Sequence, residues 1–183
     1  MTGRPVTTVQ PLGLPGVFLL HSVRHADERG FLRKVVASDV LREAGLDLVV
    51  DEVVSTTNEA AGTVRGMHYQ AAPHEETKTL WVTSGALVDV LVDVRPDHAT
   101  YGQHVAVRLS ADDDLGLYVP PGVAHGYQTL VDDTSLTYLI RGAYSPGYAR
   151  TLAWDDPVVA VEWPLPVTRI SEKDRQGHPW PPA

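Results

Sequence analysis

The sequence predicts an all-β protein with the architecture of a sandwich or barrel, such as a jelly roll. Valine fills every second position from 88 to 94, an alternation that suits a strand with two different faces. The chain also has 14 prolines and 15 glycines. They separate short apolar runs about every ten residues, a spacing typical of such β folds.

The apolar runs predict the strands, and one stretch has a helical pattern instead. A short helix is expected at residues 38–44, where Ser38 suits the N-cap, Leu41 and Ala44 share one side, and Gly45 ends the helix. From residue 164 onward the chain is rich in proline, which predicts a tail packed on the surface. In chain order, strands are expected at residues 17–20, 31–36, 50–57, 64–70, 77–83, 86–95, 104–109, 116–119, 126–130, 135–141 and 150–154.

Composition narrows the class of protein. A length of 183 residues fits one domain. The absence of cysteine excludes disulfides, thiolate metal sites and thiol nucleophiles, so a metal would need histidine and carboxylate ligands. The formal net charge of −8 argues against a nucleic-acid partner, which needs a basic face. Since no apolar run approaches the length of a membrane span or signal peptide, we expect a cytoplasmic protein with no membrane partner.

Several polar residues interrupt the β pattern. In the strand at 64–70, alternation places His68 and Gln70 on one face and Arg65 on the other. Lys78 follows ten residues after His68, and a proline-glycine turn delivers His125 to the start of a strand. Each of these residues alone is typical of an ordinary hydrogen-bonded histidine, surface lysine or capped turn. Their order along the chain is therefore the informative observation.

In that order, these and further segments resemble the dTDP-4-dehydrorhamnose 3,5-epimerase family of sugar-nucleotide epimerases. The resemblance extends from about Val17 to Asp174 and covers nearly the whole chain. One segment alone is weak evidence, but together at these spacings they indicate the family. The matching segments are 27–31 (DERGF), 65–70 (RGMHYQ), 88–90 (VDV), 92–95 (VDVR), 101–102 (YG), 121–126 (PGVAHG), 144–146 (YSP), 154–157 (WDDP) and 171–174 (SEKD).

The resemblance implies a cupin-type jelly roll with one or two short helices, in a single domain spanning residues 1–183. The core would lie at about residues 17–163, and the tail at 164–183 would contribute Asp174. It also implies a homodimer in which an N-terminal strand crosses to the partner. The implied small-molecule partner is a nucleotide-diphosphate sugar, and the implied reaction needs no metal or other cofactor.

By matching position, the resemblance implies that His68 is the general base, Asp174 the carboxylate that orients it, and Tyr138 the general acid on the opposite side. Lys78 completes the implied catalytic set. The implied substrate contacts are Arg29, Arg65, His125, Lys173, Tyr144 and Gln70, with Arg29 and Lys173 placed at the nucleotide or its diphosphate.

This set suits proton transfer at carbon. The family's substrate is a nucleotide-linked 4-keto-6-deoxy sugar, whose ketone acidifies the hydrogens on carbons 3 and 5. An imidazole, with an ordinary pKa of about 6.5, is a suitable base, and Lys78, assisted by Arg65 or His125, would stabilise the enolate oxygen. Tyr138, with an ordinary pKa of about 10, would supply the new proton from the other face, and nearby cations are expected to ease its release.

The predicted nucleotide pocket departs from the family's pattern. Lys34 and Ala149 stand where glutamates are common, Trp81 replaces a usual arginine, and residues 53–55 (VVS) lack a usual glutamine and asparagine. A CDP- or GDP-linked ketosugar is therefore an alternative to a dTDP-linked one. Inversion at carbon 3 or carbon 5 alone is an alternative to inversion at both.

Two distant alternatives belong to other classes of protein. A metal-dependent cupin enzyme would use His68, His74 and His125 with Glu75 or Glu76 as ligands, but a proline interrupts the strand that would align the first two histidines. A non-catalytic sugar-binding jelly roll needs no base or acid. Exchange of carbon-bound hydrogen with solvent distinguishes an epimerase from a binding module.

Overall fold

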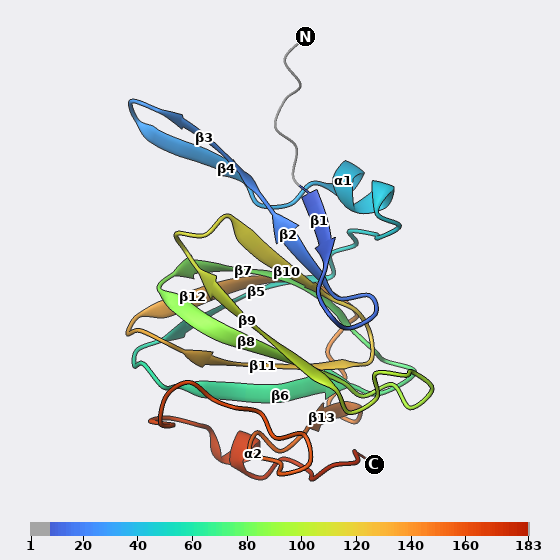
Figure 1. Ribbon diagram of the computed structural model, residues 1–183. Coiled ribbons are helices and arrows are strands. Elements are labelled where there is room, and N and C mark those ends of the chain that lie inside the picture. Colours follow the sequence, from blue (N-terminus) through green and yellow to red (C-terminus); the bar gives the residue numbers. More distant parts are fainter. Residues whose placement is uncertain (1–7, 183) are drawn as a thin grey trace.

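Two antiparallel sheets face each other and form the body of the molecule (Figure 1). The structure is a computed structural model that describes residues 8–182. The six-stranded sheet has the order β1 (Thr8–Pro11), β2 (Phe18–His21), β10 (Leu115–Val119), β7 (Thr77–Ser84), β12 (Thr134–Arg141) and β5 (Glu52–Asn58). The five-stranded sheet has the order β13 (Ala149–Thr151), β6 (Val64–Gln70), β11 (Val123–Thr129), β8 (Ala86–Asp93) and β9 (His104–Ser110).

The main core lies between the two sheets, because alternate residues of each strand point inward. Leu80, Leu117 and Leu136 from the six-stranded sheet belong to one buried cluster with Leu87 and Leu91 from the five-stranded sheet. Burial of one leucine contributes about 1.5–3 kcal/mol, so this layer holds the sheets face to face. Polar side chains also enter the space between the sheets, and the candidate site is formed by them.

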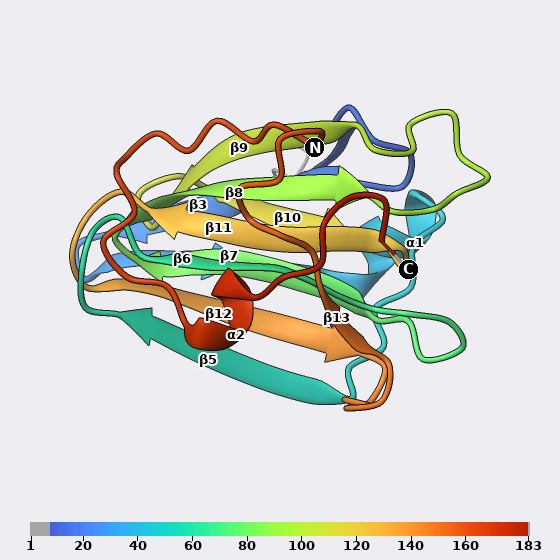
Figure 2. The ribbon, with the colours of Figure 1, turned by 90° about the horizontal axis from the view of Figure 1, so that it is seen from below.

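The C-terminal tail covers the outer face of the five-stranded sheet (Figure 2). Met67 and Val90 on that face belong to a second buried cluster, against which Trp163 and Trp180 of the tail pack. The tail also forms the short helix α2 (Glu172–Arg175), which contacts β6. Packing of the tail therefore places α2 beside a strand that supplies polar residues to the interior.

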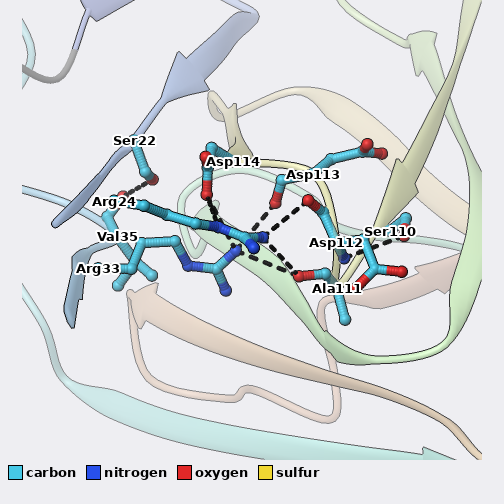
Figure 3. Close-up of polar contacts among 9 residues, drawn as sticks. All are labelled: Ser22, Arg24, Arg33, Val35, Ser110, Ala111, Asp112, Asp113 and Asp114. Atoms are coloured by element: carbon cyan, nitrogen blue, oxygen red, sulfur yellow. Dashed lines mark hydrogen bonds and ion pairs between the residues drawn. The ribbon is translucent and has the colours of Figure 1, made fainter. Parts of the chain in front are cut away.

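A two-stranded hairpin, β3 (Val23–Asp27) and β4 (Gly30–Lys34), projects from the body of the molecule (Figure 1). Two arginines anchor its base to the turn that precedes β10 (Figure 3). Arg24 Nε donates to the Asp114 carboxylate at 2.5 Å, and both Arg24 and Arg33 donate to backbone carbonyls of that turn. Toward the tip, Phe31 and Leu32 are 56% and 67% exposed, so the hairpin presents apolar side chains outward.

The all-β prediction is confirmed, with strand ends shifted by a few residues. The sequence does not predict β1 or β3, because both are largely exposed and carry few apolar residues. Strand β11 begins at Val123 rather than at residue 126, since the turn before it needs only Gly122, whose φ is +73°.

The predicted first helix is confirmed as α1 (Ser38–Glu43), and the tail adds α2 as the second. Gly45, with a φ of +75°, follows the end of α1 as expected. The prediction of Ser38 as the N-cap is wrong: Ala37 holds that position, and no side chain caps the helix. Within residues 8–182, none of the helices has the length and hydropathy to cross a membrane.

Candidate active site

A cavity of about 210 Å³, here called the inner cavity, opens between the two sheets. Both sheets contribute to it, so His68 and Tyr138 face the same cavity from opposite sheets. The lining residues are Val54 and Thr56 from β5, Lys78 from β7, Tyr138 and Ile140 from β12, Arg65 and His68 from β6, and His125 and Tyr127 from β11.

His68 is held by a carboxylate of the tail. Its Nε2 lies 2.6 Å from Oδ1 of Asp174, whose side chain is only 5% exposed. The other carboxylate oxygen accepts the Gly66 N–H at 3.3 Å. Burial raises the pKa of Asp174, but the hydrogen bond and charge of His68, together with hydrogen bonds from Gly66 and Ser171, outweigh it, so the pKa lies below its ordinary value. Because Asp174 occupies Nε2, Nδ1 is the ring nitrogen left for a ligand.

Arg65 lines the inner cavity together with His68, so the predicted separation of these two residues onto opposite faces is wrong. In the β6–β11 pairing, His68 lies opposite His125 and Arg65 lies opposite Tyr127. Two residues separate the pair on β6 and only one separates the pair on β11, which is a β-bulge. The additional residue shifts the alternation of β6 and turns Arg65 inward.

Tyr138 is buried in the opposite wall, and its ring meets that of His125 edge to face at a centroid distance of 5.9 Å. Burial, reinforced by Tyr127 and by the charge of Asp89, raises the pKa of Tyr138 well above its ordinary value. The hydroxyl therefore keeps its proton at neutral pH. Arg65 lowers this pKa, the direction expected of a nearby cation, but burial has the larger effect.

The ammonium group of Lys78 reaches the cavity as half of an ion pair with Glu76. The two side chains are 10% and 13% exposed, so water screens the pair little. Glu76 comes just before β7 and does not line the cavity. The Glu76 carboxylate thus fixes the direction of the Lys78 ammonium group from outside the cavity.

A second histidine–aspartate pair, which the sequence does not predict, lies beside the first. His125 Nε2 is 2.9 Å from Oδ2 of Asp89, and both side chains are almost completely buried. Oδ1 of Asp89 is buried without a hydrogen-bond partner. Burial raises the pKa of Asp89, although His125 and Lys78 oppose the shift. The sequence carries one signal for it: an acidic residue at an inward position of β8, between Leu87 and Leu91.

A further cavity of about 360 Å³, here called the outer cavity, adjoins the inner one. Arg65 lines both cavities. Asp174 lines the outer cavity while its partner His68 lines the inner one. The outer cavity also contains Arg169, which is paired with Glu59 at 2.8 Å. A ligand that spans both cavities would pass the Arg65 guanidinium group.

The remaining predicted contacts lie away from the inner cavity. Arg29 is near the hairpin tip, 84% exposed and paired with Asp27. Lys173 on α2 and Tyr144 are also exposed. Gln70 is buried, and its amide bonds backbone groups of two neighbouring loops, so in this chain it braces those loops.

The ligand set of the metal-dependent alternative is not brought together. His74 stacks on Tyr148 at a centroid distance of 4.3 Å and does not line the cavity of His68 and His125. Across residues 8–182, no three His, Asp or Glu side chains are arranged to hold a metal ion.

Comparison with known proteins identifies the family. The family model described as dTDP-4-dehydrorhamnose 3,5-epimerase matches residues 11–181. The chain belongs to the dTDP-4-dehydrorhamnose 3,5-epimerase family. It is 37% identical over 166 residues to the family's enzyme from Sinorhizobium fredii, covering 90% of this chain and 85% of that one.

Solved structures of this epimerase family have the same fold. The Bacillus anthracis dTDP-4-dehydrorhamnose 3,5-epimerase, with TDP and PPi bound, superposes with a TM-score of 0.92 at 33% identity, covering 95% of this chain and 99% of that one. A 3′-monoepimerase from Streptomyces bikiniensis in complex with dTDP-quinovose gives 0.87 at 29% identity, covering 93% and 86%. The chain is therefore a cupin-type jelly roll and an isomerase of the sugar-nucleotide epimerase class.

Proposed function

We propose that the protein epimerises a dTDP-linked 4-keto-6-deoxy sugar by removing a proton beside the ketone and returning it on the opposite face. The observation that carries the proposal is the placement of His68 and Tyr138 on opposite sheets around one cavity of about 210 Å³. A pyranose ring between them offers one face to an imidazole and the other to a phenol. The family membership supports the same reaction.

His68 acts as the base through Nδ1. Asp174 holds Nε2–H at 2.6 Å, which fixes the tautomer and leaves a lone pair on Nδ1. The same carboxylate stabilises the imidazolium that forms when a proton leaves carbon. The lowered pKa of Asp174 keeps it ionised throughout the cycle.

Negative charge then develops on the ketone oxygen as the enolate forms. Lys78, aimed by Glu76, supplies a cation within the same cavity, and His125, held by Asp89, supplies a ring N–H. Donors that the fold fixes in advance stabilise such an oxyanion more than mobile water does.

Tyr138 returns the proton from the other wall. Its raised pKa keeps the hydroxyl protonated while the base acts. An enolate carbon is far more basic than a phenolate, so the transfer from Tyr138 remains downhill. The site resets when the Tyr138 phenolate regains a proton from solvent and the His68 imidazolium releases one to solvent.

The relatives support a dTDP-linked substrate. Most positions at which this chain departs from the family's usual residues lie outside the inner cavity, where the sugar would bind. Of the departing positions, only Val54 lines the inner cavity, whereas Lys34, Trp81 and Ala149 do not. Turnover of matched dTDP-, CDP- and GDP-linked 4-keto-6-deoxyglucose, followed by NMR, tests the proposal. Inversion of the dTDP sugar at carbon 3, carbon 5 or both supports it, and binding with no inversion of any of the three would indicate a non-catalytic module.

The protein further acts as a homodimer in which the hairpin of one copy reaches the site of the other. Arg29 is 84% exposed and absent from the lining of both cavities of its own chain. The hairpin base is anchored by Arg24 and Arg33, while Phe31 and Leu32 remain exposed. An anchored arm with an apolar tip and an exposed arginine suits contact with a second copy. Exchange of the N-terminal strand remains part of this proposal.

Mixing two inactive variants tests the role of the hairpin in the partner's site. In a mixed dimer of R29A and H68A, one copy keeps His68 and the other keeps Arg29. If Arg29 serves the partner's site, one complete site remains; if it serves its own chain's site, none remains. Restored turnover on mixing supports the dimer. If the mixture stays as inactive as its components although the mixed dimers form, Arg29 does not serve the partner's site.

A further inference from the structure

Arg65 differs from the other cations that line the two cavities, although its side chain is partly exposed. It lines both cavities, yet it forms no ion pair with a carboxylate among residues 8–182. The other two strong cations of these cavities are paired, Lys78 with Glu76 and Arg169 with Glu59. The charge of Arg65 is therefore the one available to an anionic ligand at the junction of the two cavities.

A single amide fixes the guanidinium group of Arg65. Its Nε donates to Oδ1 of Asn58 at 2.7 Å. Asn58 is 3% exposed, and its Nδ2 donates to the Thr134 carbonyl at 2.9 Å and to the Tyr127 hydroxyl at 3.2 Å. A flipped amide would turn its NH₂ toward the guanidinium N–H, which excludes the alternative orientation. The Tyr127 hydroxyl in turn lies 3.2 Å from Thr56 Oγ1.

This network leaves Asn58 no free N–H for a ligand. Both of its N–H groups and its oxygen are occupied within the protein. Because the guanidinium group is planar, fixing Nε also sets the plane of its two terminal nitrogens. Those two nitrogens make no hydrogen bond within residues 8–182, so they can engage two oxygens of one anion side by side.

We propose that Asn58, braced by Tyr127, is a positioning residue that aims the free edge of Arg65 at the diphosphate of the substrate. The inference rests on the proposed function for the identity of the ligand, but it concerns binding and not proton transfer. It assigns the cavity junction to the diphosphate, with the sugar in the inner cavity. Asn58 acts only through Arg65, since its own hydrogen-bonding groups are used.

The test is a double-variant cycle on binding of dTDP, measured by calorimetry on the full chain, with steady-state kinetics alongside. N58A is expected to weaken dTDP binding about tenfold and to raise KM in proportion, with kcat within about threefold. R65A is expected to weaken binding at least as much. Adding N58A to R65A should then produce no further loss, because the group that Asn58 aims is gone.

Y127F removes the brace but keeps the bond between Asn58 and Arg65, and it is the milder variant, expected to weaken dTDP binding by about two- to threefold while keeping the fold. Because the Tyr127 hydroxyl also contacts Thr56 and contributes to the raised pKa of Tyr138, this variant is read by dTDP binding and not by kcat. The matched control is Q128A, which removes another buried amide whose bonds go only to the backbone of Leu165. Q128A should lower stability without changing dTDP affinity.

Two results would overturn the proposal: N58A with unchanged dTDP affinity, or an equal loss from N58A in the presence and absence of Arg65. The second pattern would mean that Asn58 contacts the ligand itself or only supports the fold. Since dTDP binding does not require turnover, an inactive wild-type protein would refute the proposed function while leaving this measurement valid.

Discussion

Replacing Asp174 by asparagine tests the most sharply defined contact of the site. The carboxylate accepts from two donors on separate oxygens, His68 Nε2 at 2.6 Å and the Gly66 N–H at 3.3 Å. The amide of the D174N variant has one oxygen. When that oxygen accepts the Gly66 N–H, the NH₂ group faces Nε2 of His68. The proton of the neutral imidazole must then lie on Nδ1, which removes the base. When the oxygen accepts the His68 Nε2–H instead, the NH₂ group points at the Gly66 N–H, so two hydrogen-bond donors face each other.

The size of the effect follows from the lost contact. A hydrogen bond to a charged group contributes about 1.5–3 kcal/mol, and one decade in rate corresponds to about 1.36 kcal/mol. The D174N variant should therefore lose between about tenfold and about 150-fold in kcat, and more where the wrong tautomer dominates. Its KM should change little, because the carboxylate points at His68 and not at the substrate.

The assay is steady-state epimerisation of the dTDP-linked ketosugar, with E172Q as control. Glu172 lies on the same helix α2, is exposed and bonds only Gln176, so this variant makes the same carboxylate-to-amide change without touching His68. E172Q should retain the wild-type kcat. A D174N enzyme with kcat within about threefold of wild type, a change below the weakest hydrogen bond expected here, would refute the assigned dyad.

The remaining predictions concern charge, pH and packing. K78M should lower kcat about 10²- to 10³-fold by removing the oxyanion cation, and steady-state turnover near wild type would exclude that role. The pKa of Asp174 is lowered in the folded state, so its stabilising contribution is present above the unfolded value of about 3.9 and is lost as pH falls through the folded value. Denaturant unfolding should thus show a steeper acid loss for wild type than for D174N, and parallel curves would contradict the shift. In G126A, the new Cβ would lie 2.5 Å from Met67 Sδ and 2.9 Å from the Arg65 carbonyl. This overpacking should lower the free energy of unfolding by about 1–3 kcal/mol, which corresponds to about 2–12 °C in Tm by calorimetry. An unchanged Tm would show that β6 shifts to make room for the methyl group without loss of stability.

The fold was largely predictable because most strands bury one face. Apolar alternation identifies a strand such as β8, whose valines face the tail and whose leucines face the other sheet. Strands β1 and β3 escaped prediction for the opposite reason: they are mostly exposed and held by backbone pairing, which leaves no apolar pattern.

The site was predictable only in part from residue types. His68, Tyr138 and Lys78 were assigned by resemblance and do share one cavity. Alternation put Arg65 on the wrong face, because a bulge on β6 becomes visible only through its pairing with β11. Asp89 and Asn58 gain their partners across strands distant in sequence, and no local pattern reports such contacts.

The central claim is that protons leave and return on opposite faces of one sugar ring, by His68 and Tyr138 respectively. Mass spectrometry and NMR of the dTDP-linked 4-keto-6-deoxy sugar incubated in D₂O measure this directly. The account predicts one solvent deuteron at every inverted carbon with wild type, exchange without inversion with Y138F, and no exchange with H68N. Inversion without solvent deuterium, or exchange that persists in H68N, would contradict it.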